Sequence, residues 1–143
     1  MLNSREKMQE SLYSAAHSYI EAGWSVIPLH GDSYPDRPKT PAIPWAEYQK
    51  RPPTDAELRT WFGEQRFQAL GIVCGQLSEL VVLDFDDHAA AESFARACPD
   101  LINTFTVRSG GRGLPHYYYS ISPDLKLDTR HAPGVDLQAS GTY

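Results

Sequence analysis

The positions of apolar side chains along the chain repeat with two different periods, which predict helices in some segments and strands in others. Residues 5–22 show helical spacing, residues 54–62 begin with a capping box, and residues 87–97 are rich in alanine, so each of these segments predicts a helix. Short apolar runs of strand-forming residues predict strands at 24–29, 69–74, 80–85, 104–108, 116–121 and 134–138. Strand pairs separated by helices indicate an α/β or α+β domain, with a mixed and largely antiparallel sheet flanked by helices.

Residues 30–53 interrupt this pattern, because they hold six of the eleven prolines. Proline fixes the backbone and removes an amide donor, so a regular helix or a central strand is excluded there. We expect a long loop, and a loop of this length in a compact domain is usually functional or mobile. Lys39 lies within it, followed by Pro41 and Trp45.

Length and composition limit the number of domains and the compartment. The chain has 143 residues, 41% of them hydrophobic, which suffices for one globular domain over residues 1–143. No apolar run is long enough to cross a bilayer and no secretory signal follows Met1, so we expect a cytoplasmic protein without membrane contact. The net charge of −5 argues against a protein that grips nucleic acid by bulk electrostatics. Cys74 and Cys98 do not have metal-ligand spacing, and we expect Cys74 in the core.

The strongest chemical signal is the segment 80–87, in which four apolar residues precede Asp84, Asp86 and Asp87. Side chains alternate across a strand, so Asp84 and Asp86 project from the same face. Two carboxylates this close repel each other unless a cation lies between them, and hard oxygen ligands suit Mg²⁺ or Mn²⁺. The alternative is a strand that ends in a polar turn, with one aspartate capping the next helix, a role that fits Asp87.

A second signal is the glycine-rich segment between Arg108 and His116. Its three glycines allow backbone N–H groups to turn inward around an anion, and arginines add charge-assisted hydrogen bonds to phosphate. The alternative is a flexible hairpin loop with exposed arginines. The spacing matches neither a Walker loop nor a dinucleotide-binding fingerprint.

The remaining polar positions are less informative when each is taken alone. A single acid in a short strand, such as Asp136, is more often a hydrogen-bonded or edge residue than a ligand. We interpret the other histidines as structural or surface residues, with His30 and His131 in loops. The tyrosines at 117–119 form an aromatic run on a strand, where packing is the first expectation and an outward ring is able to stack on a base.

Taken in order, these elements resemble the N-terminal primase–polymerase domain of replication proteins from phages, plasmids and integrated elements, within the archaeo-eukaryotic primase superfamily. That pattern is an apolar strand ending in an acid-x-acid pair, then a glycine loop leading to a histidine, then a third aspartate in a short strand. Here these features are Asp84 and Asp86, His116, and Asp136. The lysine–proline–tryptophan loop at 39–45, the helix at 54–61 and the strand at 71–75 also fit, so the resemblance spans residues 12–143.

The resemblance implies a primase-like catalytic core that makes primers on a single-stranded DNA template from nucleoside triphosphates, with Mg²⁺ or Mn²⁺. Asp84, Asp86 and Asp136 would hold the metal ions and, together with His116, form the catalytic set. The residues implied in nucleotide binding are Ser109, Gly110, Gly111, Arg112, His116 and Lys39. A helicase domain or subunit is an implied partner.

Two departures from the family pattern keep other functions open. Leu114 stands two places before the histidine, where a small polar residue is frequent, and the chain ends at Tyr143 where the family continues through further strands. We therefore expect the last strands of the domain to be missing. The alternative function is a catalytically inactive, truncated module of the same fold that binds nucleotide, nucleic acid or a partner protein. A third possibility is a metal-dependent phosphotransferase or nuclease that uses the same carboxylates.

Overall fold

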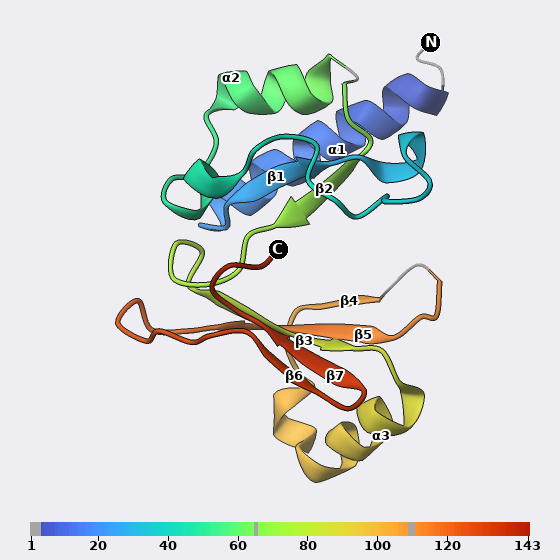
Figure 1. Cartoon of the computed structure of the whole chain (residues 1–143), viewed down its shortest axis with the longest axis vertical. Helices are drawn as coiled ribbons and strands as arrows, with labels where there is room; N and C mark the ends of the chain where they lie inside the picture. The colour runs from blue at the N-terminus through green and yellow to red at the C-terminus, as the bar shows by residue number, and fades with distance from the viewer. Residues whose placement is uncertain (1–3, 65, 109–110) are drawn as a thin grey trace. The chain divides into compact units, whose positions relative to one another are not determined.

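The computed structural model describes residues 4–64, 66–108 and 111–143, and it divides into an N-terminal unit, Met1–Val73, and a C-terminal unit, Cys74–Tyr143 (Figure 1). Each unit contains its own antiparallel sheet and at least one helix. The expected mixture of helices with largely antiparallel strands is confirmed, although the strands form two sheets instead of one.

The N-terminal unit packs helices on a two-stranded sheet of β1 (Val26–Leu29) and β2 (Ala69–Ile72). Helix α1 (Ser4–Glu21) precedes β1, and Gly23 follows it with φ +90°, the left-handed conformation that glycine adopts readily at a helix end. Helix α2 (Asp55–Leu58) continues into a π-type turn, Arg59–Gly63. The fully buried side chains of this unit include Val26, Ile27, Leu58, Phe62 and Val73. Its core therefore consists mainly of strand β1 and the α2 segment.

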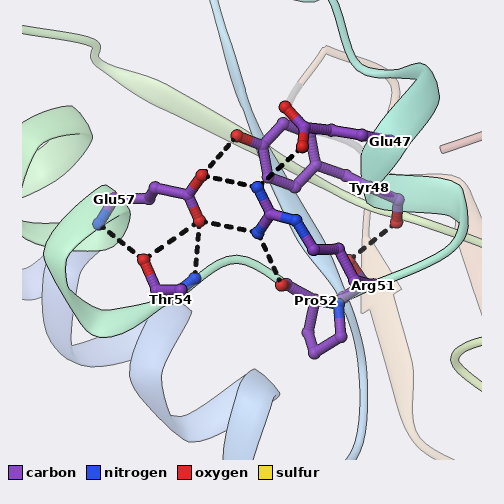
Figure 2. A network of polar contacts seen from close by, with 7 residues as sticks. Glu47, Tyr48, Arg51, Pro52, Thr54 and Glu57 are labelled. Atoms are coloured by element: carbon purple, nitrogen blue, oxygen red, sulfur yellow. Dashed lines mark hydrogen bonds and ion pairs between the residues drawn. The ribbon is translucent and has the colours of Figure 1, made fainter.

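A charged network joins the proline-rich loop to the start of α2 (Figure 2). Thr54 and Glu57 form the predicted capping box, and Arg51 donates to both carboxylate oxygens of Glu57 at 2.8 and 2.9 Å. Tyr48 donates its hydroxyl proton to the same carboxylate at 2.8 Å. The loop 30–53 is thus anchored to the helix, and it contains two short 3₁₀ turns, Gly31–Ser33 and Ala46–Gln49.

The C-terminal unit contains a five-stranded antiparallel sheet in the order β4-β5-β3-β7-β6 (Figure 1). Strand β3 (Leu80–Phe85) lies in the middle, and the glycine-rich segment connects β4 (Thr106–Arg108) to β5 (Pro115–Ser120). A two-residue turn, Pro133-Gly134, joins β6 (Arg130–Ala132) to β7 (Val135–Gln138). Segments that are far apart in the sequence therefore lie next to the central strand β3.

One face of the five-stranded sheet is covered by helix α3 (His88–Ala97). The buried cluster on that face contains Phe85, Ala91, Leu114 and Tyr117, with Phe94 packed against it. Because side chains alternate along β3 and β5, residues 84 and 116 point to the opposite face. On that opposite face Leu80 and Val82 are buried, whereas Asp84 is partly exposed.

Several sequence expectations differ from the structure in detail. Strand β6 was not expected. The turn at 75–79 separates the two sheets, since β2 pairs with β1 and β3 pairs with β5 and β7. Cys74 and Cys98 are not joined by a disulfide, and burial raises the pKa of the Cys74 thiol to about 12. Along the described ranges, no helix combines the length and apolar character needed to span a membrane.

Candidate functional site

Four polar side chains form a row across the C-terminal sheet. The strand register pairs Asp84 with His116 of β5 on one side and with Asp136 of β7 on the other, and it pairs Asp136 with His131 of β6. Directly paired residues of antiparallel strands point to the same face, with Cβ atoms about 4.5–5.5 Å apart. These four side chains therefore lie on the face opposite α3. We call them the carboxylate row, in the order His116, Asp84, Asp136 and His131.

Each carboxylate of the row contacts the histidine on its outer side. His116 Nε2 lies 3.0 Å from Asp84 Oδ1, and His131 Nδ1 lies 2.8 Å from Asp136 Oδ1. The two central side chains are about one-third exposed, 35% for Asp84 and 34% for Asp136. Like charges directly opposite each other in a sheet are destabilising, and the flanking imidazoles offset part of that repulsion. The row combines acceptor oxygens with access to solvent.

Asp86 directly follows β3, and its backbone connects two other parts of the site. Its N–H donates to the Gly134 carbonyl at 3.1 Å, which continues the ladder between β3 and β7 beyond the strand. Its carbonyl accepts from Arg112 Nη1 at 3.0 Å, so the end of the glycine-rich segment is attached to the end of the carboxylate strand. The Asp86 side chain is exposed. Arg112 therefore lies beside the backbone of Asp86.

The turn before β7 sets the position of Asp136. Proline followed by glycine is the pattern of a type II turn, in which the second central residue needs positive φ, and Gly134 has φ +79°. A Cβ at Gly134 would lie 2.8 Å from Ala90 Cβ and 2.9 Å from Asp87 Cβ, closer than real side chains approach. The glycine thus lets the hairpin lie against the start of α3, where Asp87 caps the helix by accepting from the Ala90 N–H at 2.8 Å.

Of the six expected nucleotide-binding residues, His116 belongs to this row, and the structure does not place the others in it. Ser109 and Gly110 lie outside the described residues, and Gly111 lies in the turn before β5. Lys39 belongs to the N-terminal unit, so its expected contact with a phosphate stays a prediction. The residues that the sheet itself brings together are Asp84, His116 and Asp136, with Asp86 and Arg112 at its end.

Comparison with protein families identifies this arrangement of motifs. Residues 16–143 match the model of the Prim-Pol family, described as bifunctional DNA primase/polymerase, N-terminal. The chain belongs to the Prim-Pol family. No curated protein matches its sequence significantly. The family assigns a primase/polymerase-type function, a nucleotidyltransferase-like activity, and nucleotides and DNA as substrates.

Prim-Pol enzymes generally use divalent metal ions, and the donors present in this chain suit such ions. Paired carboxylates on an accessible sheet face are the oxygen ligands that Mg²⁺ and Mn²⁺ prefer. Among the side chains that the structure describes, no group of three Asp, Glu, His or Cys residues is arranged to hold a metal ion. The individual ligands therefore remain a prediction.

One member of the row in this Prim-Pol domain was not predicted from the sequence. His131 was expected in a loop as a surface residue, whereas it lies in β6 beside Asp136. The short strand is three residues long and fully exposed, so it has no apolar alternation that would reveal it. The available signal was the proline–glycine turn, because a two-residue hairpin turn places the residues on either side of it in register.

Proposed function

We propose that the chain catalyses template-directed nucleotidyl transfer and makes primers on single-stranded DNA with Mg²⁺ or Mn²⁺. The observation that supports this most strongly is the register that aligns His116, Asp84 and Asp136 on one accessible face. We further propose that it acts in the replication of a phage, plasmid or integrated element, together with a helicase domain or subunit.

In this proposal, Asp84, Asp86 and Asp136 hold the divalent ions. Two such ions would activate the primer 3′-hydroxyl and neutralise the pyrophosphate leaving group. Asp84 and Asp136 are held in register by the ladder of β3 and β7, so their relative position depends on the sheet and not on a loop. Bound cations would also reverse the local negative charge. The net negative charge of the chain then does not argue against nucleic-acid binding at this site.

The proposed role of His116 and Arg112 is to bind the triphosphate of the incoming nucleotide. His116 lies near the start of strand β5, which fixes the position of its backbone. Its side chain is 23% exposed. The Arg112 guanidinium uses Nη1 for the Asp86 carbonyl, and a guanidinium carries five donors. The remaining donors suit phosphate oxygens. Residues 109–111 and Lys39 are proposed as further phosphate contacts.

Primer synthesis on a single-stranded DNA template tests this function. The wild-type chain is compared with an Asp84→Ala/Asp86→Ala variant, and an Asp100→Ala/Asp124→Ala variant serves as the control because both of these aspartates are exposed in the same unit. We expect synthesis by the wild type and the control, and its loss in the first variant. Equal activity in all three would contradict the assignment of the aspartates.

The same assay separates the other candidate functions. Binding of Mn²⁺ and nucleoside triphosphate without extension would identify a non-catalytic module. Shortening of the single-stranded DNA instead of extension would identify a nuclease. Calorimetric titration of the wild type with Mn²⁺ and nucleoside triphosphate measures the first outcome, and analysis of product lengths measures the second.

A further inference from the structure

We propose that His131 is a positioning residue that orients the Asp136 carboxylate for metal binding. The inference rests on the proposed function, because it assigns a role toward the same metal ions. Its starting point is the contact of 2.8 Å between His131 Nδ1 and Asp136 Oδ1. An ionised carboxylate only accepts hydrogen bonds, so Nδ1 carries the proton in this contact and donates it.

The hairpin of β6 and β7 places His131 and Asp136 side by side. His131 and Asp136 are directly paired across β6 and β7, and the two-residue turn at Pro133-Gly134 fixes that register. Within the described part of the chain, His131 is the side chain that makes a polar contact with Asp136. A hydrogen bond to Oδ1 restricts the rotation of the carboxylate, and Oδ2 is the oxygen that we propose for the cation. Hydrogen bonds to metal-ligating carboxylates typically change metal affinity by about 10–100-fold.

The two histidines at the ends of the row differ in the nitrogen atom that contacts the carboxylate and in the exposed fraction of the side chain. His116 contacts its carboxylate through Nε2 and is 23% exposed, whereas His131 contacts its carboxylate through Nδ1 and is 73% exposed. The ring of His131 thus holds the carboxylate with its inner nitrogen while the rest of the ring lies in solvent. Because the contact is exposed, we expect an effect at the lower end of the range, about tenfold.

Two isosteric substitutions test this role specifically. The amide nitrogen of asparagine occupies a position close to Nδ1 of histidine, and that of glutamine a position close to Nε2. We therefore expect His131→Asn to retain the Mn²⁺ affinity of the wild type, whereas His131→Gln and His131→Ala weaken it about tenfold. The measurement is calorimetric titration with Mn²⁺ alone. His17→Asn is the matched control, since His17 forms an exposed histidine–carboxylate contact with Glu21 on α1.

A second readout separates positioning from a direct role. In primer synthesis, His131→Ala should need about tenfold more Mn²⁺ for half-maximal rate and should recover the wild-type rate at saturating Mn²⁺. Asp136→Ala should not recover. Thermal unfolding of each variant checks that the hairpin is folded.

The outcomes also distinguish this inference from the proposed function. If the wild type and Asp136→Ala bind Mn²⁺ equally, the metal site itself is wrong and the inference falls with it. If Asp136→Ala loses Mn²⁺ binding while His131→Ala keeps the wild-type affinity, the inference alone is overturned. Equal affinities of the Asn and Gln variants would overturn it as well, because a positioning contact through Nδ1 requires a difference between them.

Discussion

The two units of the chain use charged side chains in opposite ways. In the N-terminal unit, the Glu57 carboxylate accepts from Arg51, Tyr48 and the backbone and side chain of Thr54, so both of its oxygens are engaged (Figure 2). In the C-terminal unit, the Asp136 carboxylate has the contact with His131 and stands opposite another carboxylate. Both oxygens of Glu57 thus accept hydrogen bonds, whereas the contact between His131 and Asp136 involves one oxygen of Asp136.

This difference has an energetic consequence. Arg51 holds the pKa of Glu57 well below its usual range, and the Thr54 backbone N–H acts in the same direction. Burial and the hydrogen bond to Glu57 raise the pKa of Tyr48 to about 12. These shifts mean that the ionised network stabilises the fold. Paired like charges in a sheet cost free energy instead, and natural proteins accept such costs where function requires them.

The largest expected effect is on activity, and it comes from neutralising one carboxylate of the row. Asp136→Asn should lower the rate of primer synthesis at least about a hundredfold, because a carboxylate proposed to hold the metal ions loses its charge. Its free energy of unfolding should stay unchanged or rise by a few tenths of a kcal/mol, since the repulsion between Asp84 and residue 136 is removed. Steady-state kinetics and urea unfolding measure the two quantities. A large loss of stability would show that the row is a structural network like that of Glu57.

The next effect is on stability, in the network of the N-terminal unit. Glu57→Ala removes the capping box and leaves Arg51 and Tyr48 without their shared acceptor, which should cost about 2 kcal/mol. Urea unfolding measures this cost. Glu47→Ala is the matched control, because Glu47 contacts the same arginine but is 57% exposed, and it should cost less than about 1 kcal/mol. Equal costs for the two variants would show that the network does not depend on the capping position.

The same network predicts how stability depends on pH. The folded-state pKa of Glu57 is depressed, so its contribution is fully present above the unfolded-state value of about 4.3 and is lost as the pH falls toward the folded-state value. Glu57→Gln should therefore make the acid limb of the unfolding free energy flatter, by at most about 1.4 kcal/mol per pH unit for one proton. Urea unfolding between pH 2 and pH 6 measures this slope. An acid limb identical to that of the wild type would contradict the role of the ionised carboxylate.

The sequence predicted best the features that depend on neighbouring residues. The capping box at Thr54 and the cap at Asp87 are local, and both are confirmed. The alternation of Asp84 and His116 away from the apolar face also follows from strand periodicity alone.

Features that depend on pairing between distant segments could not be predicted from the residues alone. No local pattern shows that β2 pairs with β1 instead of β3, because both alternatives bury similar apolar runs. The role suggested for Asp136 came from a family resemblance, since a single acid in a short strand carries little information. His131 was missed for the same reason, because its place beside Asp136 arises only when the hairpin pairs.

The smallest expected effect separates the consecutive aspartates, which the sequence alone presents as one acidic cluster. Asp87 caps α3, whereas the exposed Asp86 side chain is proposed to bind metal. Asp87→Ala should lower the free energy of unfolding by about 1 kcal/mol, and Asp87→Ser should restore most of it because serine also caps. Both variants should keep primer synthesis at the wild-type rate below the unfolding transition, whereas Asp86→Ser should lose it. If Asp87→Ser lost activity while its stability was restored, Asp87 would belong to the site. The separation between structural and functional carboxylates would then not hold within this segment.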